Sequence, residues 1–494
     1  MKSLEQLLQS GAELCRKVRA VVRFHPHDSS TEHGRARERY RRMALTTMAS
    51  LTARGIGLLA TLVSVPLTFR YLGAERYGLW MVLVSFISAM SFADLGIGNG
   101  VMNAISEAYG KDDRELAREY VSSGVALMLA IAAILAVAGA IAFPLLPWER
   151  LFNVRSVAVA GEGAKAFLVL FAWFVVNIPL GVITRVQAGL QKGYWSQIVG
   201  AAGNVGSLLG ILVVIQLRGS LPWLVFASTS GVILATAVNG WLLFRAYPWL
   251  TPSMHAFRSS SAQKILRLGL MFFVLQVAVA LGYTSDNIVI TQVMGAAAVA
   301  VYAVPQKLFS FVSQLVSMGI SPLWPAYGEA IARGDVAWVR RTFWASIRLT
   351  LAATVPLCAG LAIAGPWILR VMVGKSLHAP VSLLAALAVW GGIAAVSTPM
   401  AMLLNGAGIL KVQTVISGIA SVSNLIVSIL LTRRLGVVGV CLGSVLTQVT
   451  LVFPAYFFVI RKLFREMSGA RMASDSSLQI DLARSFQPDL PRKR

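Results

Sequence analysis

The chain contains a long series of apolar runs, each about as long as a helix needs to be to cross a membrane. Roughly 20 residues span the hydrocarbon layer of about 30 Å. Runs of this kind are predicted at residues 44–69, 78–104, 121–147, 165–184, 196–216, 222–245, 266–293, 297–322, 344–366, 380–404, 411–432 and 436–460. Because hydrocarbon offers the backbone no hydrogen-bond partner, each run is expected to cross as a helix.

The composition excludes an ordinary soluble enzyme. Hydrophobic residues occupy 56% of the 494 positions and charged residues only 13%, whereas a soluble domain carries about 25% charged residues. The short alternating segments of a transmembrane β-barrel are absent from the sequence. The predicted fold class is therefore an all-α integral membrane protein with about twelve transmembrane helices.

The formal net charge of +23 raises the question of a nucleic-acid partner. The basic residues do not form one stripe, however, and this argues against such a partner. About 32 lysines and arginines fall in the tails and one alternate set of loops, and about 10 in the other set, as the positive-inside rule describes. Arg333, Arg340, Arg341 and Arg348 flank one loop of the basic set. The asymmetry predicts that both termini are cytoplasmic.

The two halves of the chain share short motifs at nearly constant spacing. The matches are Leu72-Gly73-Ala74 with Met294-Gly295-Ala296, Glu107-Ala108 with Glu329-Ala330, and Asn204 with Asn424. They predict duplication of a six-helix unit, which gives two pseudo-symmetric six-helix lobes around a central cavity. Transporters built from such repeats hold their substrate at the interface between the repeats.

The same pattern predicts five regions along the chain. They are a cytoplasmic extension at 1–43, an N-terminal lobe at 44–246, a cytoplasmic linker at 247–265, a C-terminal lobe at 266–460 and a cytoplasmic tail at 461–494.

Several motifs resemble those of one transporter family. The segments Phe69–Trp80, Asp94–Gly100 and Val186–Gly193 resemble, in order, segments of the polysaccharide repeat-unit flippases. These flippases belong to the multidrug, oligosaccharidyl-lipid and polysaccharide exporter superfamily. The resemblance covers about residues 44–460. It implies movement of undecaprenyl-diphosphate-linked glycan, such as O-antigen units, from the cytoplasmic to the periplasmic leaflet of the bacterial inner membrane. Membrane lipids and a glycan polymerase or ligase are the partners it implies.

Four ionisable residues are predicted inside the membrane, where such groups are rare and face protein or a water-filled cavity. By depth along neighbouring helices, Arg54 is placed to pair with Asp94, and Lys307 with Asp286. One interpretation is that these pairs only fix helix packing. The other is that Arg54 and Lys307 line the cavity and attract the diphosphate of the cargo, since arginine binds phosphate through two parallel hydrogen bonds. Asp286 is also a candidate for coupling to protons or sodium.

Two further basic residues, Arg185 and Lys192, flank the inner end of the fourth predicted helix. They are candidates for receiving the diphosphate headgroup, and the alternative is ordinary anchoring by positive charge. Glu107 and Glu329 are expected to be solvated.

No catalytic constellation is present in the sequence, which predicts a protein that is not an enzyme. Cys15, Cys358 and Cys441 are isolated, so no metal site and no cofactor is predicted, and no GxxxxGK[ST] phosphate loop occurs. Three alternatives to the flippase remain. They are a cation-coupled multidrug exporter, a flippase for lipid-linked peptidoglycan precursor, and a membrane-embedded glycosyltransferase or polymerase.

Overall fold

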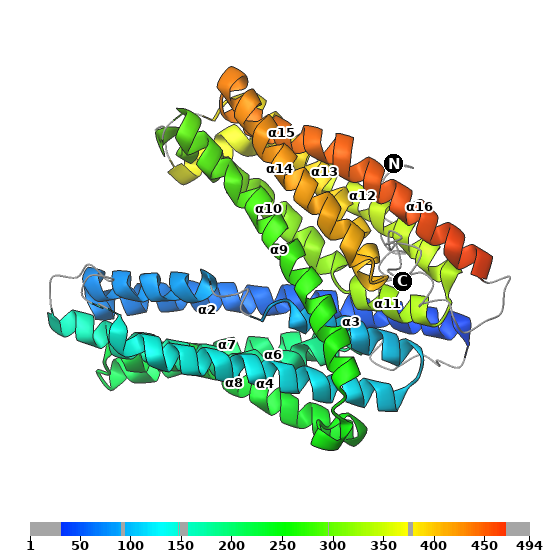
Figure 1. Cartoon of the computed structure of the whole chain (residues 1–494). Coiled ribbons are helices and arrows are strands. Elements are labelled where there is room, and N and C mark those ends of the chain that lie inside the picture. Colours follow the sequence, from blue (N-terminus) through cyan, green and yellow to red (C-terminus); the bar gives the residue numbers. More distant parts are fainter. Residues whose placement is uncertain are drawn as a thin grey trace, which may run out of the picture. The chain divides into compact units, whose positions relative to one another are not determined.

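The structure is a computed structural model that describes residues 31–89, 94–146, 148, 157–294, 296–373 and 379–470. Throughout these residues the chain forms helices and contains no strand (Figure 1). The all-α fold class predicted from the sequence is therefore confirmed. The chain divides into two compact units, Met1–Gly269 and Leu270–Arg494.

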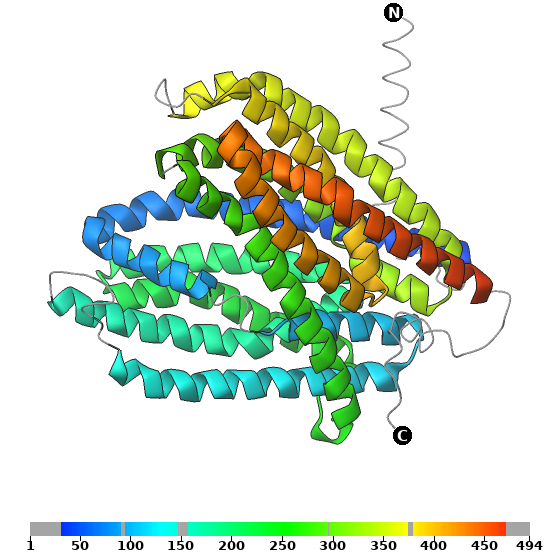
Figure 2. The same cartoon turned by 45° about the horizontal axis from the view of Figure 1, so that its top comes forward.

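The described residues of the first unit form six main helices and the beginning of a seventh. They are α2 (Glu32–Ala89), α3 (Ile97–Gly110), α4 (Arg114–Ala142), α6 (Val157–Gly189), α7 (Gly193–Gln216), α8 (Leu221–Ala246) and the start of α9 (Ser259–Met294). Three short 3₁₀ turns lie at Phe143–Leu145, Pro248–Leu250 and Met254–Ala256. Helices α4, α6, α7 and α8 lie side by side in Figure 2.

The first two predicted membrane helices meet at a sharp break rather than at a loop. Within α2 the backbone of Gly73 has φ 72° and ψ 172°, a conformation that a residue with a Cβ atom adopts only under strain. A second break precedes α3, where Leu95 (φ 48°) and Gly96 (φ 68°) are both left-handed. The second predicted membrane helix, 78–104, is therefore interrupted before Ile97.

In the second unit the described residues that follow α9 form seven helices. They are α10 (Ala296–Ile320), α11 (Leu323–Ala332), α12 (Val336–Val373), α13 (Val381–Gly406), α14 (Leu410–Leu435), α15 (Val437–Thr447) and α16 (Phe453–Ala470), the last two joined by a π-helical turn at Gln448–Val452. The order of elements repeats that of the first unit: the short α3 precedes the long α4, and the short α11 precedes the long α12.

Ten helices in the described part of the chain are long and apolar enough to cross a membrane. They correspond to ten of the twelve predicted runs, including 380–404, which is the helix α13. Of the other two, 78–104 includes residues outside the described part, and 297–322 coincides with α10.

Glycines bring neighbouring helices into close contact in both units. A Cβ atom on Gly231 of α8 would lie 2.3 Å from the backbone nitrogen of Ser207 on α7. In the second unit, a Cβ atom on Gly439 of α15 would lie 2.4 Å from the backbone of α14 at Thr432. Small residues of this kind allow close backbone approach, a common basis of helix association in membranes.

Replacing Gly231 with alanine is expected to destabilise the first unit by about 3 kcal/mol, the upper end of the cost of overpacking, because the added methyl meets backbone. The measurement is thermal unfolding of the detergent-solubilised protein. The matched control is Gly200→Ala on α7, where a Cβ atom meets nothing within 4 Å, and its unfolding temperature should not fall. An equal fall in both variants would contradict the close packing of α7 on α8.

Candidate functional site

A polar pocket of about 200 Å³ lies inside the first unit, between α2, α7 and α8. The residues that give it polar character are Thr61, Ser64 and Thr68 of α2, Asn204 and Ser207 of α7, and Ser228 of α8. Tyr77 and Trp80 add aromatic rings whose centres lie 6.1 Å apart, and the remaining lining residues are glycine or aliphatic. A membrane-embedded pocket that combines hydroxyl, amide and aromatic groups is suited to a cargo rich in hydroxyl groups.

The hydrogen bonds of the pocket leave one amide available. Thr61 donates to the carbonyl of Gly57 at 2.8 Å, and Thr68 donates to that of Ser64 at 2.8 Å, so these hydroxyls keep only their acceptor capacity. By contrast, no hydrogen bond joins the side chain of Asn204 to another described residue. An amide offers two donors and an acceptor, so Asn204 is the strongest candidate in this pocket for contact with a polar ligand.

Arg54 lies on α2 one turn before the pocket. Its side chain is exposed. At 100° per residue, Arg54, Gly57 and Thr61 point within about 60° of one another, and Gly57 follows Arg54 by about 4.5 Å along the axis. The helix therefore presents the arginine on the face that lines the pocket. This placement is compatible with the predicted contact between Arg54 and a phosphate, which stays a prediction.

Asp94, the predicted partner of Arg54, lies in a turn rather than deep in a helix. Its Oδ1 accepts a hydrogen bond from the backbone of Gly96 at 3.0 Å. Its Oδ2 lies near the guanidinium group of Arg185. A Cβ atom added to Gly98 would lie 3.1 Å from this oxygen and 3.0 Å from Nε of Arg185, so both groups border the same small space. Counting depth along a continuous helix missed this arrangement because the chain turns at Leu95 and Gly96.

Asp286, the predicted partner of Lys307, is hydrogen-bonded to a tyrosine instead. The carboxylate is 5% exposed, and its Oδ2 accepts a hydrogen bond from Tyr302 at 2.8 Å. Its Oδ1 is buried and has no hydrogen-bond partner among the described residues. Lys307 is exposed on α10 and forms no ion pair with Asp286. The reason is rotational: five residues after Tyr302, Lys307 points about 140° away.

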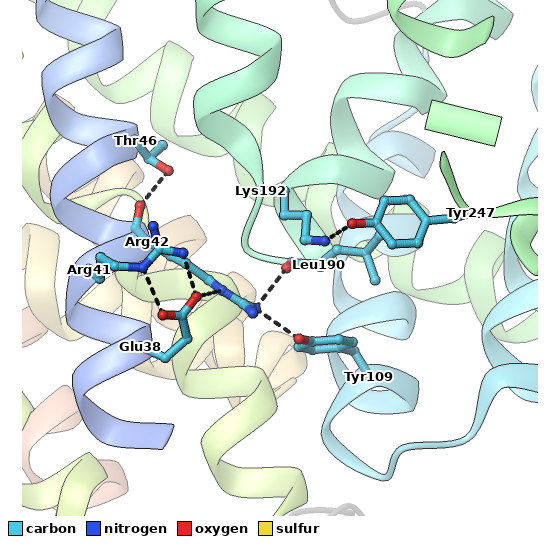
Figure 3. A network of polar contacts seen from close by, with 8 residues as sticks. All are labelled: Glu38, Arg41, Arg42, Thr46, Tyr109, Leu190, Lys192 and Tyr247. Atoms are coloured by element: carbon cyan, nitrogen blue, oxygen red, sulfur yellow. Dashed lines mark hydrogen bonds and ion pairs between the residues drawn. The ribbon is translucent and has the colours of Figure 1, made fainter. Parts of the chain in front are cut away.

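Lys192 is held by an aromatic residue. Its ammonium group donates to the hydroxyl of Tyr247 and lies 4.1 Å from the centre of that ring (Figure 3). Both Lys192 and Arg185 are half-buried. To reach a headgroup, Lys192 would have to leave Tyr247, and Arg185 would have to turn away from the nearby carboxylate of Asp94. Contact of Arg185 and Lys192 with a headgroup stays a prediction.

A network at the start of α2 was not predicted from the sequence. Glu38, which is 4% exposed, accepts hydrogen bonds from Arg41 at 2.7 Å and Arg42 at 2.8 Å. Arg42 also donates to the hydroxyl of Tyr109 on α3 at 2.8 Å, and Figure 3 shows it pointing toward the loop that contains Leu190. The sequence does contain a pattern that predicts such a network, namely a glutamate followed by arginines three and four positions later. It fell in residues assigned to a cytoplasmic extension, of which 32–43 are the first turns of α2.

A second polar cluster ties α3 to the start of α9. The Nζ atoms of Lys264 and Lys111 each lie 2.8 Å from an oxygen of Glu107, and Lys264 also donates to Tyr120 at 2.8 Å. Burial alone would raise the pKa of Glu107, but the two lysines outweigh it and lower the pKa below its ordinary value. Glu107 therefore remains ionised at neutral pH, as a structural contact between helices.

The expectation that both repeated glutamates are solvated is wrong for Glu329. This residue is 4% exposed and pairs with Arg333 at 2.5 Å. Glu107 and Lys111 have the same four-residue spacing, which places the two side chains on one face of a helix. The sequence repeat is therefore also a structural repeat: a glutamate near the end of α3, and another near the end of α11, each pairs with a basic residue four positions later.

Comparison with known proteins identifies the family. The sequence model of a family described as "Polysaccharide biosynthesis protein" matches residues 44–330. The chain belongs to this family. With ten candidate spans in its described part, this member of the polysaccharide biosynthesis protein family is a multi-pass membrane protein.

Individual relatives agree with the family. The membrane protein EpsK of Bacillus subtilis is 20% identical over 81% of this chain and 79% of its own length. A protein of Salmonella typhimurium named as an O-antigen transporter is 23% identical over 79% of this chain and 90% of its own length. A crystal structure of a MATE protein in the bent conformation has a TM-score of 0.73 at 14% identity, covering 87% of this chain and 97% of the other. This last likeness shows the fold.

Proposed function

We propose that this protein is a flippase that moves lipid-linked oligosaccharide, such as polysaccharide or O-antigen repeat units, from the cytoplasmic to the periplasmic leaflet. The proposal is supported by membership of the polysaccharide biosynthesis protein family and by relatives named as O-antigen transporters. The observation that carries it is the polar pocket between α2, α7 and α8. One of these helices, α2, also presents the exposed Arg54 on the face that lines the pocket. The family relationship argues for a transporter rather than an enzyme.

In this proposal the cations and the pocket bind different parts of the cargo. Arg54 and Lys307, both exposed, attract the diphosphate, because charge-assisted hydrogen bonds from a guanidinium group to phosphate are strong and directional. Asn204 and the hydroxyls of the pocket bind the sugars. Arg185, which lies near Asp94, and Lys192, which donates to Tyr247, are further candidates for contact with the headgroup.

The proposal includes a location and an orientation for the chain. The relatives are bacterial, and the distribution of basic residues supports an inner-membrane protein with both termini in the cytoplasm. Its substrate is the lipid-linked glycan, and a glycan polymerase or ligase acts on the product in the outer leaflet.

Purified protein in liposomes is expected to translocate fluorescent lipid-linked oligosaccharide, and a potential that is negative on the side of origin is expected to accelerate it. One net negative charge gains about 2.3 kcal/mol per 100 mV, which corresponds to a rate increase of up to about 50-fold. The measurement is accessibility of the label to a quencher, with the potential set by a potassium gradient and valinomycin. Protein-free liposomes are the control.

The same liposomes discriminate the alternatives. Translocation of lipid-linked peptidoglycan precursor in preference to oligosaccharide would replace the proposed substrate with that precursor. Export of a lipophilic cation with no glycan translocation would favour the multidrug exporter, the function suggested by the MATE likeness and the buried Asp286. Flipping that ignores the potential would exclude the proposed energy source but leave the substrate assignment intact.

A further inference from the structure

A basic groove of about 600 Å³ lies in the second unit, between the first turns of α12 and the end of α16. Arg340, Arg341, Trp344 and Arg348 line it from α12, and Ser468 lines it from α16. The groove is built on rigid packing: Phe343, which is 2% exposed, contacts Phe464 of α16 with ring centres 5.8 Å apart. The proposed transport mechanism makes no use of this groove.

The three guanidinium groups are available to a ligand. All three arginines are exposed. None of them forms an ion pair with a carboxylate in the part of the chain that the structure describes, and Arg348 makes one hydrogen bond, to the carbonyl of Trp344 at 3.3 Å. Three uncompensated positive charges around one cavity attract an anion, and planar guanidinium groups match the oxygens of a phosphate in particular.

The face of α12 that bears the arginines continues directly into an apolar surface. Leu351 comes seven residues after Trp344, and Val355 comes seven residues after Arg348. Seven residues are nearly two helical turns, so each apolar side chain points within about 20° of the residue seven positions before it. Leu351 is 37% exposed and Val355 is 52% exposed. Both lie within the candidate membrane span Val336–Arg370. A ligand that uses the whole face therefore has an anionic head and an apolar tail.

The tryptophan indicates where the membrane surface lies. Trp344 is 44% exposed and lies between Arg341 and Arg348, one to two turns before the apolar face begins at Leu351. Tryptophan is enriched at the boundary between headgroups and hydrocarbon, and long arginine side chains there extend toward the headgroups. The groove is thus placed at the depth of lipid phosphates.

We propose that this groove is a binding site for the headgroup of an anionic phospholipid, with the acyl chains lying along Leu351 and Val355. Basic pockets between transmembrane helices are suited to such headgroups. The volume of about 600 Å³ is in the range of pockets that hold a drug-sized ligand. The proposal concerns a lipid of the surrounding membrane and does not rest on the transport function.

Native mass spectrometry of the full-length protein in detergent tests the site, with dioleoylphosphatidylglycerol and dioleoylphosphatidylcholine added at equal concentration. The wild type is expected to retain phosphatidylglycerol in preference. The variant Arg340→Gln/Arg341→Gln/Arg348→Gln is expected to lose that preference by at least about tenfold, since each basic residue near a membrane surface contributes about 1 kcal/mol.

The matched control removes the same charge from the same unit outside the groove. Arg370, Arg433 and Arg434 are exposed, and Arg370→Gln/Arg433→Gln/Arg434→Gln should keep the preference. Equal retention by both triple variants, or a wild type that retains phosphatidylcholine equally well, would overturn the proposal. Displacement of the lipid by millimolar inorganic phosphate would reduce the groove to a simple anion site. If the groove variant does not fold, Arg341→Gln and Arg348→Gln alone decide, each with an expected loss of about fivefold.

Discussion

Replacing Arg54 with alanine is expected to abolish export of surface glycan while the amount of protein in the membrane stays unchanged. Arg54 is exposed and shares a helix face with Gly57 and Thr61, which line the polar pocket. The cargo carries its negative charge on phosphates, and hydrogen bonds to charged groups contribute about 1.5–3 kcal/mol each. Loss of two such bonds from one guanidinium group lowers export by at least about 100-fold, which in a surface-glycan assay is loss of export. Glycan at the cell surface and protein in the membrane are quantified together in a deletion strain that expresses the variant.

Two further variants separate charge from position. Arg54→Lys keeps the charge but not the planar fork, so its export should lie between that of the wild type and that of Arg54→Ala. Arg70→Ala is the matched control, because Arg70 is also an exposed arginine on α2 but points about 160° away from Arg54. Lys307→Ala is measured alongside as the second proposed cation. Full export in both Arg54→Ala and Lys307→Ala would leave only a packing role for these residues.

The sequence is sufficient to predict the fold class and the positions of ten of the twelve predicted membrane helices. These depend on the length and polarity of local runs, which are properties of consecutive residues. The least regular run, 380–404, forms the continuous helix α13 despite Gly391, Gly392 and Pro399, since a membrane helix tolerates such residues where neighbouring helices pack on it. Gly391 in fact meets the side chain of Cys358 on α12.

The contacts between helices were harder to predict, because they depend on backbone turns and on rotation about each helix axis. Asp94 was placed by depth alone, and the turn at Leu95 and Gly96 directs it to Arg185. The pocket itself was not predicted. Its lining joins α2 to the much later pair α7 and α8. Its most available group, Asn204, is evident in the sequence only as a mark of the repeat.

The two repeated asparagines show how duplicated units have diverged. Asn424 is 8% exposed and accepts hydrogen bonds from Ser428 at 3.2 Å and Ser444 at 3.3 Å, which joins α14 to α15. At the equivalent place in the first unit, Asn204 lines a pocket instead. A polar side chain that packs helices in one unit is thus available for a ligand in the other. This difference supports the assignment of sugar binding to the first unit.

Replacing Asp286 with asparagine is expected to lower glycan export at least about fivefold. If Asp286 couples export to a proton or cation, a coupling free energy of about 1–3 kcal/mol is typical, and its lower limit corresponds to about fivefold. Asparagine has nearly the same shape and retains an acceptor for Tyr302, which bonds to Asp286 at 2.8 Å. It removes only the charge and the capacity to bind a proton or a cation. A carboxylate that is 5% exposed within a membrane helix is costly. Its buried Oδ1, without a partner in the described residues, is where a proton would bind.

Proteoliposomes with an imposed pH gradient distinguish coupling from a defect in packing. Flipping by the wild type should respond to the gradient, and flipping by Asp286→Asn should be slow with and without it, while the protein remains at least as stable because a buried charge has been removed. The control is Asp113→Asn, which also removes a carboxylate but keeps the acceptor that caps α4 through Leu116 at 2.9 Å. If Asp286→Asn flips at the wild-type rate and still responds to the gradient, Asp286 is not the coupling residue. Its bond to Tyr302 then serves only to hold α9 against α10.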